Sequence, residues 1–131
     1  MSSNASFVSS LKAMRELLTS RSPEREDITQ KAFAANPWFI PEFTNAAVES
    51  MATEFLNPAA YQQWISSYPK RSDSPKTIAV IMAGNLPLVG FHDLLCILAS
   101  GHKALIKLSD KDAILLPWVT DQWIKFDPSL A

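Results

Sequence analysis

TIAVIMAGNLPLVGFHDLLCILASGHKALIKLS, residues 77–109, is the segment from which the fold class can be predicted. Residues 77–82 are a short apolar run rich in β-branched side chains, which is typical of a strand buried on both faces. Residues 88–100 are apolar on nearly all sides and predict a buried helix, with Gly101 just beyond its end. Residues 104–108 predict a second buried strand. The order strand, helix, strand predicts a βαβ unit with parallel strands and a right-handed crossover.

Segments on either side of this stretch complete the predicted organisation. Residues 109–112 offer turn and cap side chains, and residues 113–126 predict a last helix with Pro117 in its first turns. Residues 69–76, PKRSDSPK, are polar and contain two prolines, so we expect a linker and a domain boundary there. The predicted fold class is therefore α/β: a helical N-terminal region at 1–68, the linker, and a partial Rossmann-like βαβα unit at 77–131.

The leader, residues 1–68, has the apolar spacing of helices. In the first expected helix, apolar side chains recur every three or four residues, at Phe7, Leu11, Met14 and Leu18. A polar break at 20–25 precedes a second helix expected at 28–35. That helix ends before Pro37, because a proline disfavours helical geometry in the preceding residue.

Two further helices are expected in the leader. Pro41 suits the first position of a third helix, whose apolar stripe consists of Phe43, Ala47, Met51 and Phe55. Asn57 and Pro58 predict a cap and a first turn for a fourth helix. One face of that helix is expected to carry Tyr61, Trp64, Ile65 and Tyr68. Helical spacing alone predicts such stripes, so we interpret them as core or docking surface.

Composition excludes several classes of function. The 131 residues include 12 Lys and Arg against 13 Asp and Glu, which disfavours a nucleic-acid partner. The longest apolar run, residues 94–99, is far shorter than the roughly 20 residues that span a bilayer, and no secretory signal is evident. One cysteine and two histidines exclude an internal disulfide framework and make a zinc cluster a poor hypothesis. We therefore expect a soluble, cytoplasmic protein without a membrane span.

The predicted sheet is incomplete. Two parallel strands are marginal by themselves, and a helix as apolar as residues 88–100 needs partners on all sides. We therefore expect the 131 residues to be a fragment, or to obtain their missing partners from another chain.

The loop after the first predicted strand, residues 82–90, is the first candidate site. In open α/β sheets, ligands bind at the carboxyl ends of the strands, and the start of a helix favours an anion. Gly84 would let a ligand approach the backbone, and Asn85 would place an amide donor where it could polarise a carbonyl. The pattern is neither a dinucleotide fingerprint nor a P-loop. The alternative is that Gly84 only forms a turn and Asn85 only caps the helix.

A lysine at the end of the second strand is the matching candidate. Lys107 interrupts an apolar strand near its carboxyl end, on the edge where Asn85 is expected. Its ammonium group could reach a hydroxyl or phosphate group of a ligand there. The alternative is a charge that extends into water at the end of a strand.

Residues 77–109 resemble the opening of the nucleotide-binding domain in the aldehyde dehydrogenase superfamily. The segments AGNLPLVGFHD (83–93) and SGHKALIKLS (100–109) are similar to acyl-CoA reductases of the LuxC type, and the leader segment NPWFIPE (36–42) resembles them too. The resemblance covers nearly the whole chain. It implies that residues 77–131 are the first half-repeat of the cofactor domain. It also implies reduction of fatty acyl-CoA to aldehyde with NADPH, through an acyl-enzyme formed on a cysteine.

The resemblance assigns roles to both ends of the expected site. Asn85 would donate to the oxygen of the thioester or hemithioacetal. The nicotinamide-ribose side would be lined by the backbone of Met82, Ala83 and Gly84. Lys107 would contact the adenosine ribose or its 2′-phosphate.

The residues after Lys107 bear on the choice of cofactor in the same family. Ser109 would lie beside the lysine, and Asp110 falls where many NAD-preferring members carry a glutamate. Position 108 is leucine where most dehydrogenases have proline, which leaves the choice between NAD and NADP open.

The catalytic cysteine of the family lies far downstream of the matched segment. Cys96 is a poor substitute, because a position among Leu95, Ile97 and Leu98 predicts a core thiol with a raised pKa. His92 and Asp93 are expected to make structural hydrogen bonds. The piece is therefore predicted to be inactive alone and to require the rest of the enzyme or an oligomer. Two alternatives stay open: a stand-alone binding or assembly module completed by a partner chain, and a phosphate-binding regulator that uses the Gly84 loop.

Overall fold

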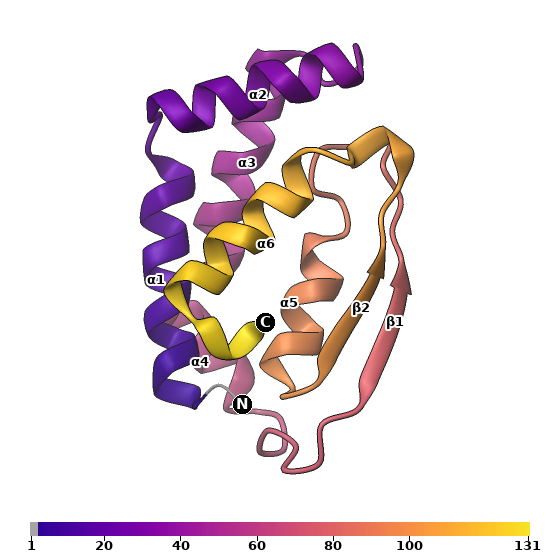
Figure 1. Ribbon diagram of the computed structural model, residues 1–131. Coiled ribbons are helices and arrows are strands. Elements are labelled where there is room, and N and C mark those ends of the chain that lie inside the picture. The colour runs from indigo at the N-terminus through magenta and orange to yellow at the C-terminus, as the bar shows by residue number, and fades with distance from the viewer. Residues whose placement is uncertain (1–2) are drawn as a thin grey trace.

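The computed structural model describes residues 3–131, which form a mixed α/β structure made mostly of helices. In chain order the elements are α1 (Asn4–Thr19), α2 (Pro23–Ala35), α3 (Pro41–Phe55), α4 (Pro58–Ile65), β1 (Thr77–Ile81), α5 (Phe91–Ala99), β2 (Lys103–Lys107), the 3₁₀ turn η1 (Asp110–Asp112), α6 (Leu115–Phe126) and the 3₁₀ turn η2 (Pro128–Leu130) (Figure 1). A helical region and a small parallel sheet are thus confirmed. Assignment to the Rossmann-like fold of aldehyde dehydrogenases stays a prediction.

The two strands pair in parallel, as predicted. Their register runs from Thr77 opposite Lys103 to Ile81 opposite Lys107. The chain returns from β1 to β2 through α5, which ends at Ala99, just before the expected Gly101, a residue with φ +84°. The amide groups of Gly101 and His102 donate to the carbonyls of Leu98 and Ile97, both at 3.1 Å, which satisfies the last turn of α5.

The strands are not buried on both faces, so that prediction is wrong. Ile81 is 82% exposed and Leu105 is 61% exposed, on the face that points away from α5. Val80, Ala104 and Ile106, on the other face, are half-buried against the core. The reason is that the described helices lie to one side of the strands (Figure 1). An apolar run shows that a strand needs cover, but it does not show whether the cover is present.

The stripe of the first helix is confirmed. Phe7, Leu11, Met14 and Leu18 are all fully buried. The second helix starts at Pro23, earlier than the predicted residue 28. Ser22 explains the difference, because its side chain accepts the amide hydrogen of Arg25 and Pro23 suits the first helical turn.

The third helix buries a different face from the one predicted. Phe43 is 64% exposed and Phe55 is 41% exposed, and of the predicted stripe only Met51 is buried. The buried face consists of Thr44, Asn45, Val48, Met51 and Ala52. This face differs from the predicted one because Arg25 of α2 is buried against it. The Nη2 of Arg25 donates to Asn45 Oδ1 at 2.9 Å and to the Asn45 carbonyl at 3.2 Å. A buried guanidinium group needs such polar partners.

The fourth helix is shorter than the predicted aromatic face. Its start is confirmed, because the Asn57 side chain accepts the amide hydrogens of Ala59 and Ala60. Tyr61 is buried, whereas Trp64 is 37% exposed. The helix ends at Ile65, so Tyr68 lies beyond it and is 56% exposed.

One aromatic cluster joins the leader to the βαβα unit. Trp123 of α6 stacks on Phe7 of α1 at a centroid distance of 5.6 Å and on Phe91 of α5 at 5.7 Å. Its Nε1 donates to Ser10 Oγ at 2.8 Å, which satisfies the indole inside the core. The core is therefore continuous from the leader to α5 and α6. The division into domains at residues 69–76 stays a prediction.

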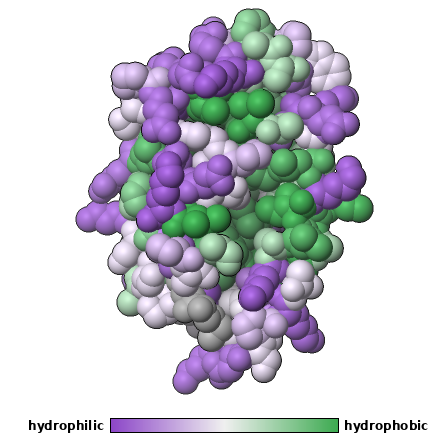
Figure 2. All heavy atoms as spheres, in the orientation of Figure 1, coloured by the Kyte–Doolittle hydropathy of each residue, from purple (hydrophilic) through white to green (hydrophobic). Residues whose placement is uncertain are grey.

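The surface differs from side to side. Figure 2 shows hydrophobic residues gathered beside the strands and over the space between the strands and α6, in the orientation of Figure 1.

Within residues 3–131, no helix is long and apolar enough to cross a membrane.

Candidate functional site

The candidate site is the rim, which we define as residues 82–90 after β1 and residues 107–112 at the end of β2. The amide of Met82 donates to the carbonyl of Lys107 at 3.0 Å, which extends the parallel pairing by one residue. Both strands therefore end at the same edge of the sheet (Figure 1). Asn85 lies in the first rim segment and Lys107 begins the second, and both are exposed. The topology thus brings the two segments of the predicted site together.

A glycine sets how closely the two rim segments approach. A Cβ added to Gly84 would lie 2.3 Å from Ser109 Oγ and 2.6 Å from Ser109 Cβ. Only glycine fits there, because real side chains essentially never make such contacts. The space beside Gly84 on this side is filled by Ser109 of this chain. The glycine therefore joins the two rim segments.

The side chain of Met82 belongs to the core. Met82 is 7% exposed, and a Cβ on Gly90 would lie 2.4 Å from its Sδ. Ala83, between Met82 and Gly84, is exposed. Of the three residues predicted to line the ribose, Ala83 alone is exposed, while Met82 and Gly84 are buried.

The buried helix starts later than predicted. The predicted start is Leu88, but α5 begins at Phe91, and the residues before it form turns. Leu88 has φ +56°, a left-handed conformation that a non-glycine residue rarely adopts. Its amide donates to Asp112 Oδ2 at 2.9 Å. The amide of Leu88, which the predicted anion site would have used as a donor, is therefore already bonded to the carboxylate of Asp112.

Asp112 is a buried polar residue that the sequence suggested only as a turn or cap residue. It is 6% exposed, and its carboxylate binds the first rim segment through the amide of Leu88. Burial raises the pKa of its carboxyl group, and the hydrogen bond from the amide of Leu88 partly opposes that shift. An acidic residue ahead of an apolar helix is the signal that could have identified it.

The leader contributes to the second rim segment. Asn36 Nδ2 donates to the carbonyl of Lys111 at 3.0 Å, and its Oδ1 accepts the amide hydrogen of Trp38. The Lys111 ammonium group lies 4.6 Å from the centroid of the Trp38 ring, a cation–π contact. Sequence reasoning missed the bond between Asn36 and Lys111, because the two residues are 75 positions apart and no spacing rule connects them.

Charged and polar groups at the rim are open to a ligand. In the part of the chain that the structure describes, neither the Asn85 amide nor the Lys107 ammonium group has a hydrogen bond or ion pair to another side chain. Ser109 Oγ accepts the amide hydrogen of Lys111 at 3.2 Å, and Asp110 at the start of η1 is exposed. The rim can therefore offer a cation, an amide donor and a hydroxyl group to an anionic ligand.

Cys96 lies on a different part of α5. Its Sγ is 3.9 Å from both ring nitrogens of His92, next to a shallow cavity of about 250 Å³ that Phe55 and Trp64 also line. The thiol is half-buried at this groove, so the prediction of a core position is wrong in part. Burial raises the pKa of the thiol, as predicted, and the negative charge of Asp93 adds to that shift. Cys96 is therefore a thiol at neutral pH, a poor nucleophile.

Among residues 3–131, no group of three or more His, Cys, Asp and Glu side chains is arranged to hold a metal ion.

Comparisons with protein-family models, with curated proteins and with solved structures each gave no match.

Proposed function

We propose that the chain carries the NADPH-binding start of an acyl-CoA reductase, which reduces fatty acyl-CoA to aldehyde. One observation carries this proposal: the loops after two adjacent parallel strands touch at Gly84 and Ser109, with an exposed lysine, Lys107, at the end of the second strand. Nucleotides bind at this edge of parallel sheets, where loops end the strands. The sequence resemblance supplies the reaction.

The residues of the rim fit one end of the cofactor better than the other. The Lys107 ammonium group suits a ribose hydroxyl or a 2′-phosphate, and the Ser109 hydroxyl group lies in the neighbouring turn. The exposed carboxylate of Asp110 suits ribose hydroxyls and opposes a 2′-phosphate, whereas Lys107 attracts one, so these two residues leave the choice between NADPH and NADH open. When bound, the cofactor supplies the hydride. Because the side chains of Met82 and Leu88 are buried, the backbone of Ala83 is the part of this loop that would line the nicotinamide-ribose side.

Asn85 has the second role in this proposal. Its exposed amide would donate a hydrogen bond to the thioester oxygen and stabilise the negative charge that develops there. The attacking thiolate must come from a cysteine other than Cys96, whose pKa is raised. We therefore expect the 131 residues alone to lack reductase activity, and a cysteine-dependent production of aldehyde by them would contradict the proposal.

NADPH titration tests the binding step. Fluorescence of the reduced nicotinamide would be followed as the purified chain is added, for the wild type, Lys107→Ala and Lys12→Ala. Loss of one charge-assisted hydrogen bond should weaken binding about tenfold, or about 1.4 kcal/mol, in Lys107→Ala. Lys12 on α1 is also exposed and controls for the change in net charge. Equal affinities in the three proteins would remove Lys107 from the site.

A partner-completed assembly module is the second candidate, and the exposed sheet face favours it. Ile81 and Leu105 present apolar side chains on a face that residues 3–131 leave uncovered. An assembly module would bind a partner through this face, and Lys107→Ala would leave that binding unchanged. Sedimentation of the purified wild type and of the Leu105→Lys variant separates the two candidates. Only the assembly module requires that face for its function.

A further inference from the structure

Asn85 lies in a loop whose first end is fixed against the residues that follow β2. Gly84, the residue before it, packs so closely on Ser109 that an added Cβ would be 2.6 Å from the Ser109 Cβ. Two residues after Asn85, the ring of Pro87 fixes the φ angle of the backbone. The loop therefore has little conformational freedom on either side of Asn85.

The second end of the loop is fixed by Asp112. The amide of Leu88 donates to Asp112 Oδ2 at 2.9 Å, and Leu88 has φ +56°, a conformation that costs free energy for a residue with a Cβ. Such a conformation persists only where the surrounding contacts hold it. The buried carboxylate supplies one of those contacts, so its removal should allow the backbone of Leu88 to relax.

The turn that carries Asp112 is itself held in place. The amide of Asp112 donates to the Ser109 carbonyl at 3.1 Å, and Asn36 of the leader donates to the Lys111 carbonyl at 3.0 Å. Ser109 lies only two positions after Lys107, the last residue of β2. The same short segment therefore fixes the loop before α5 relative to the lysine that ends the strand.

We propose that Asp112 is a positioning residue for Asn85: its carboxylate fixes the backbone that carries the Asn85 amide group before any ligand binds. A donor to a developing oxyanion is effective when it needs no rearrangement during the reaction. Asp112 is 6% exposed, so it acts through the loop and not by touching a ligand. The role assigned to Asn85 rests on the proposed function, whereas the fixed conformation of its loop does not, so the two can be tested separately.

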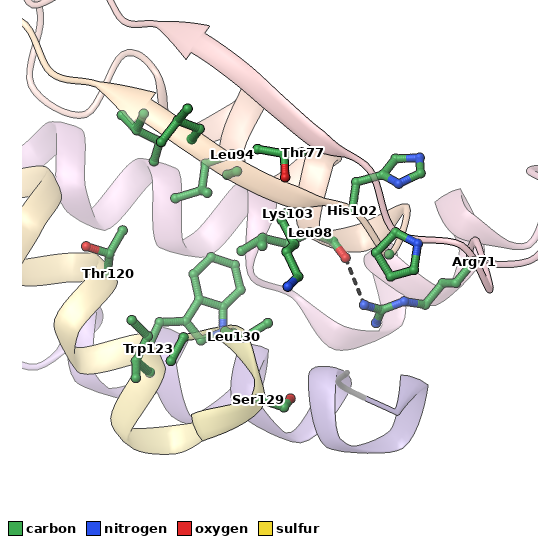
Figure 3. Close-up of a pocket in the computed structure, with 17 residues that line it drawn as sticks. Arg71, Thr77, Leu94, Leu98, His102, Lys103, Thr120, Trp123, Ser129 and Leu130 are labelled. Carbon is green, nitrogen blue, oxygen red and sulfur yellow. Dashed lines mark hydrogen bonds between the residues drawn. The ribbon is translucent and has the colours of Figure 1, made fainter.

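A cavity away from the rim provides the position for a control. It has a volume of about 700 Å³ and lies between β2, α5 and α6, and neither residues 82–90 nor residues 107–112 line it (Figure 3). Thr120 lines it from α6, and its hydroxyl group donates to carbonyls of its own helix. Thr120→Ala therefore removes a hydrogen bond and some packing without changing a contact of the rim.

Order parameters of the backbone amides, measured by NMR relaxation on the full chain without ligand, test the proposal. Asp112→Ala and Asp112→Leu remove the acceptor, and leucine has the same branched shape as aspartate. Asp112→Asn keeps an acceptor and removes the charge. We expect the order parameter of Asn85 to be about 0.85 in the wild type, Asp112→Asn and Thr120→Ala, and to fall below about 0.6 in Asp112→Ala and Asp112→Leu.

The contrast between variants separates positioning from stability. Asp112→Leu fills the buried space, so it keeps the test decisive if Asp112→Ala does not fold. An unchanged order parameter at Asn85 in the folded variants without an acceptor would overturn the proposal. A loss of order spread over the whole chain, or found also in Thr120→Ala, would overturn it too, because it would show general destabilisation. Titration of the wild type with NADPH tests the proposed function independently: a failure to bind removes that function, and the order parameters still decide whether Asp112 fixes the loop.

Discussion

Two sides of the molecule carry apolar residues that need cover, with opposite results. On the side of α1, Phe7, Leu11 and Met14 are completely buried, because α3, α4 and α6 pack around them. On the side of β1 and β2, Ile81 and Leu105 are 82% and 61% exposed. Both sets of residues are equally apolar in the sequence. The difference shows that a pattern specifies which face needs a partner, while the partner itself decides whether burial occurs.

Trp123 should give the largest effect on the closed side. Trp123→Ala removes both ring stacks and leaves a cavity between α1 and α5, so the free energy of unfolding should fall by about 3–5 kcal/mol. Urea denaturation followed by circular dichroism measures the change. Trp38→Ala is the matched control, because Trp38 is 66% exposed. If Trp123→Ala does not fold, Trp123→Phe should still lower the midpoint. Equal midpoints for the Trp123 and Trp38 variants would contradict the shared core.

Asp112, which lies where the buried core meets the rim, should give the next largest effect on stability. Asp112→Ala leaves the buried amide of Leu88 without an acceptor and should destabilise the protein by about 1–3 kcal/mol. Asp112→Asn keeps an acceptor and removes a buried charge, so it should be at least as stable as the wild type at pH 7. Chemical denaturation compares the three proteins. An Asn variant as unstable as the Ala variant would show that the charge itself is required.

The same residue predicts a dependence on pH. Its folded-state pKa is raised above the ordinary value of 3.8, so the native state binds the proton more tightly than the unfolded state. The contribution of Asp112 to stability is therefore lost as pH rises from about 4 through the folded pKa. Wild type should gain stability relative to Asp112→Asn as pH falls from 7 toward 4. A constant difference between the two unfolding curves across that range would exclude a raised pKa.

Local and distant interactions explain which predictions succeeded. The stripe of α1, the cap at Asn57 and the end of α5 at Gly101 depend on neighbouring residues, and the sequence predicted all three correctly. The buried face of α3 depends on Arg25 of α2, and the start of α5 depends on Asp112. Such tertiary contacts override local spacing, and a single sequence does not show them.

The predictions for the candidate site divide in the same way, into those that local patterning supports and those that depend on distant contacts. The parallel strand order predicted that the loops of Asn85 and Lys107 would meet at one rim, because the ends of parallel strands share an edge. The contact between Gly84 and Ser109 and the bond from Asn36 to Lys111 were not predictable. Each joins residues from segments that local patterning treats separately. Glycine at position 84 signalled a close approach but did not identify the approaching residue.

Gly84 should give a moderate effect confined to the rim. Gly84→Ala forces a Cβ against Ser109, so the two loops must separate, at a cost of about 1–3 kcal/mol. Ser109→Gly removes the clashing atoms, and the double variant should recover part of the lost stability. Unfolding free energies of the four proteins in this double-mutant cycle measure the coupling. Additive effects of the two substitutions would mean that the loops do not touch.

Leu105 should give the smallest effect on stability, because its side chain lies on the open face of the sheet. Because Leu105 is 61% exposed, Leu105→Ser should change the free energy of unfolding by no more than about 0.5 kcal/mol. Leu11→Ala, at a completely buried leucine, should cost about 2–5 kcal/mol in the same assay. Leu105→Ser should also reduce the binding of a hydrophobic dye, because it removes apolar surface from the open sheet face. A large loss of stability in Leu105→Ser would mean that this face is already covered in solution, by a second copy or by another part of the protein, and the contrast between the two sides would disappear.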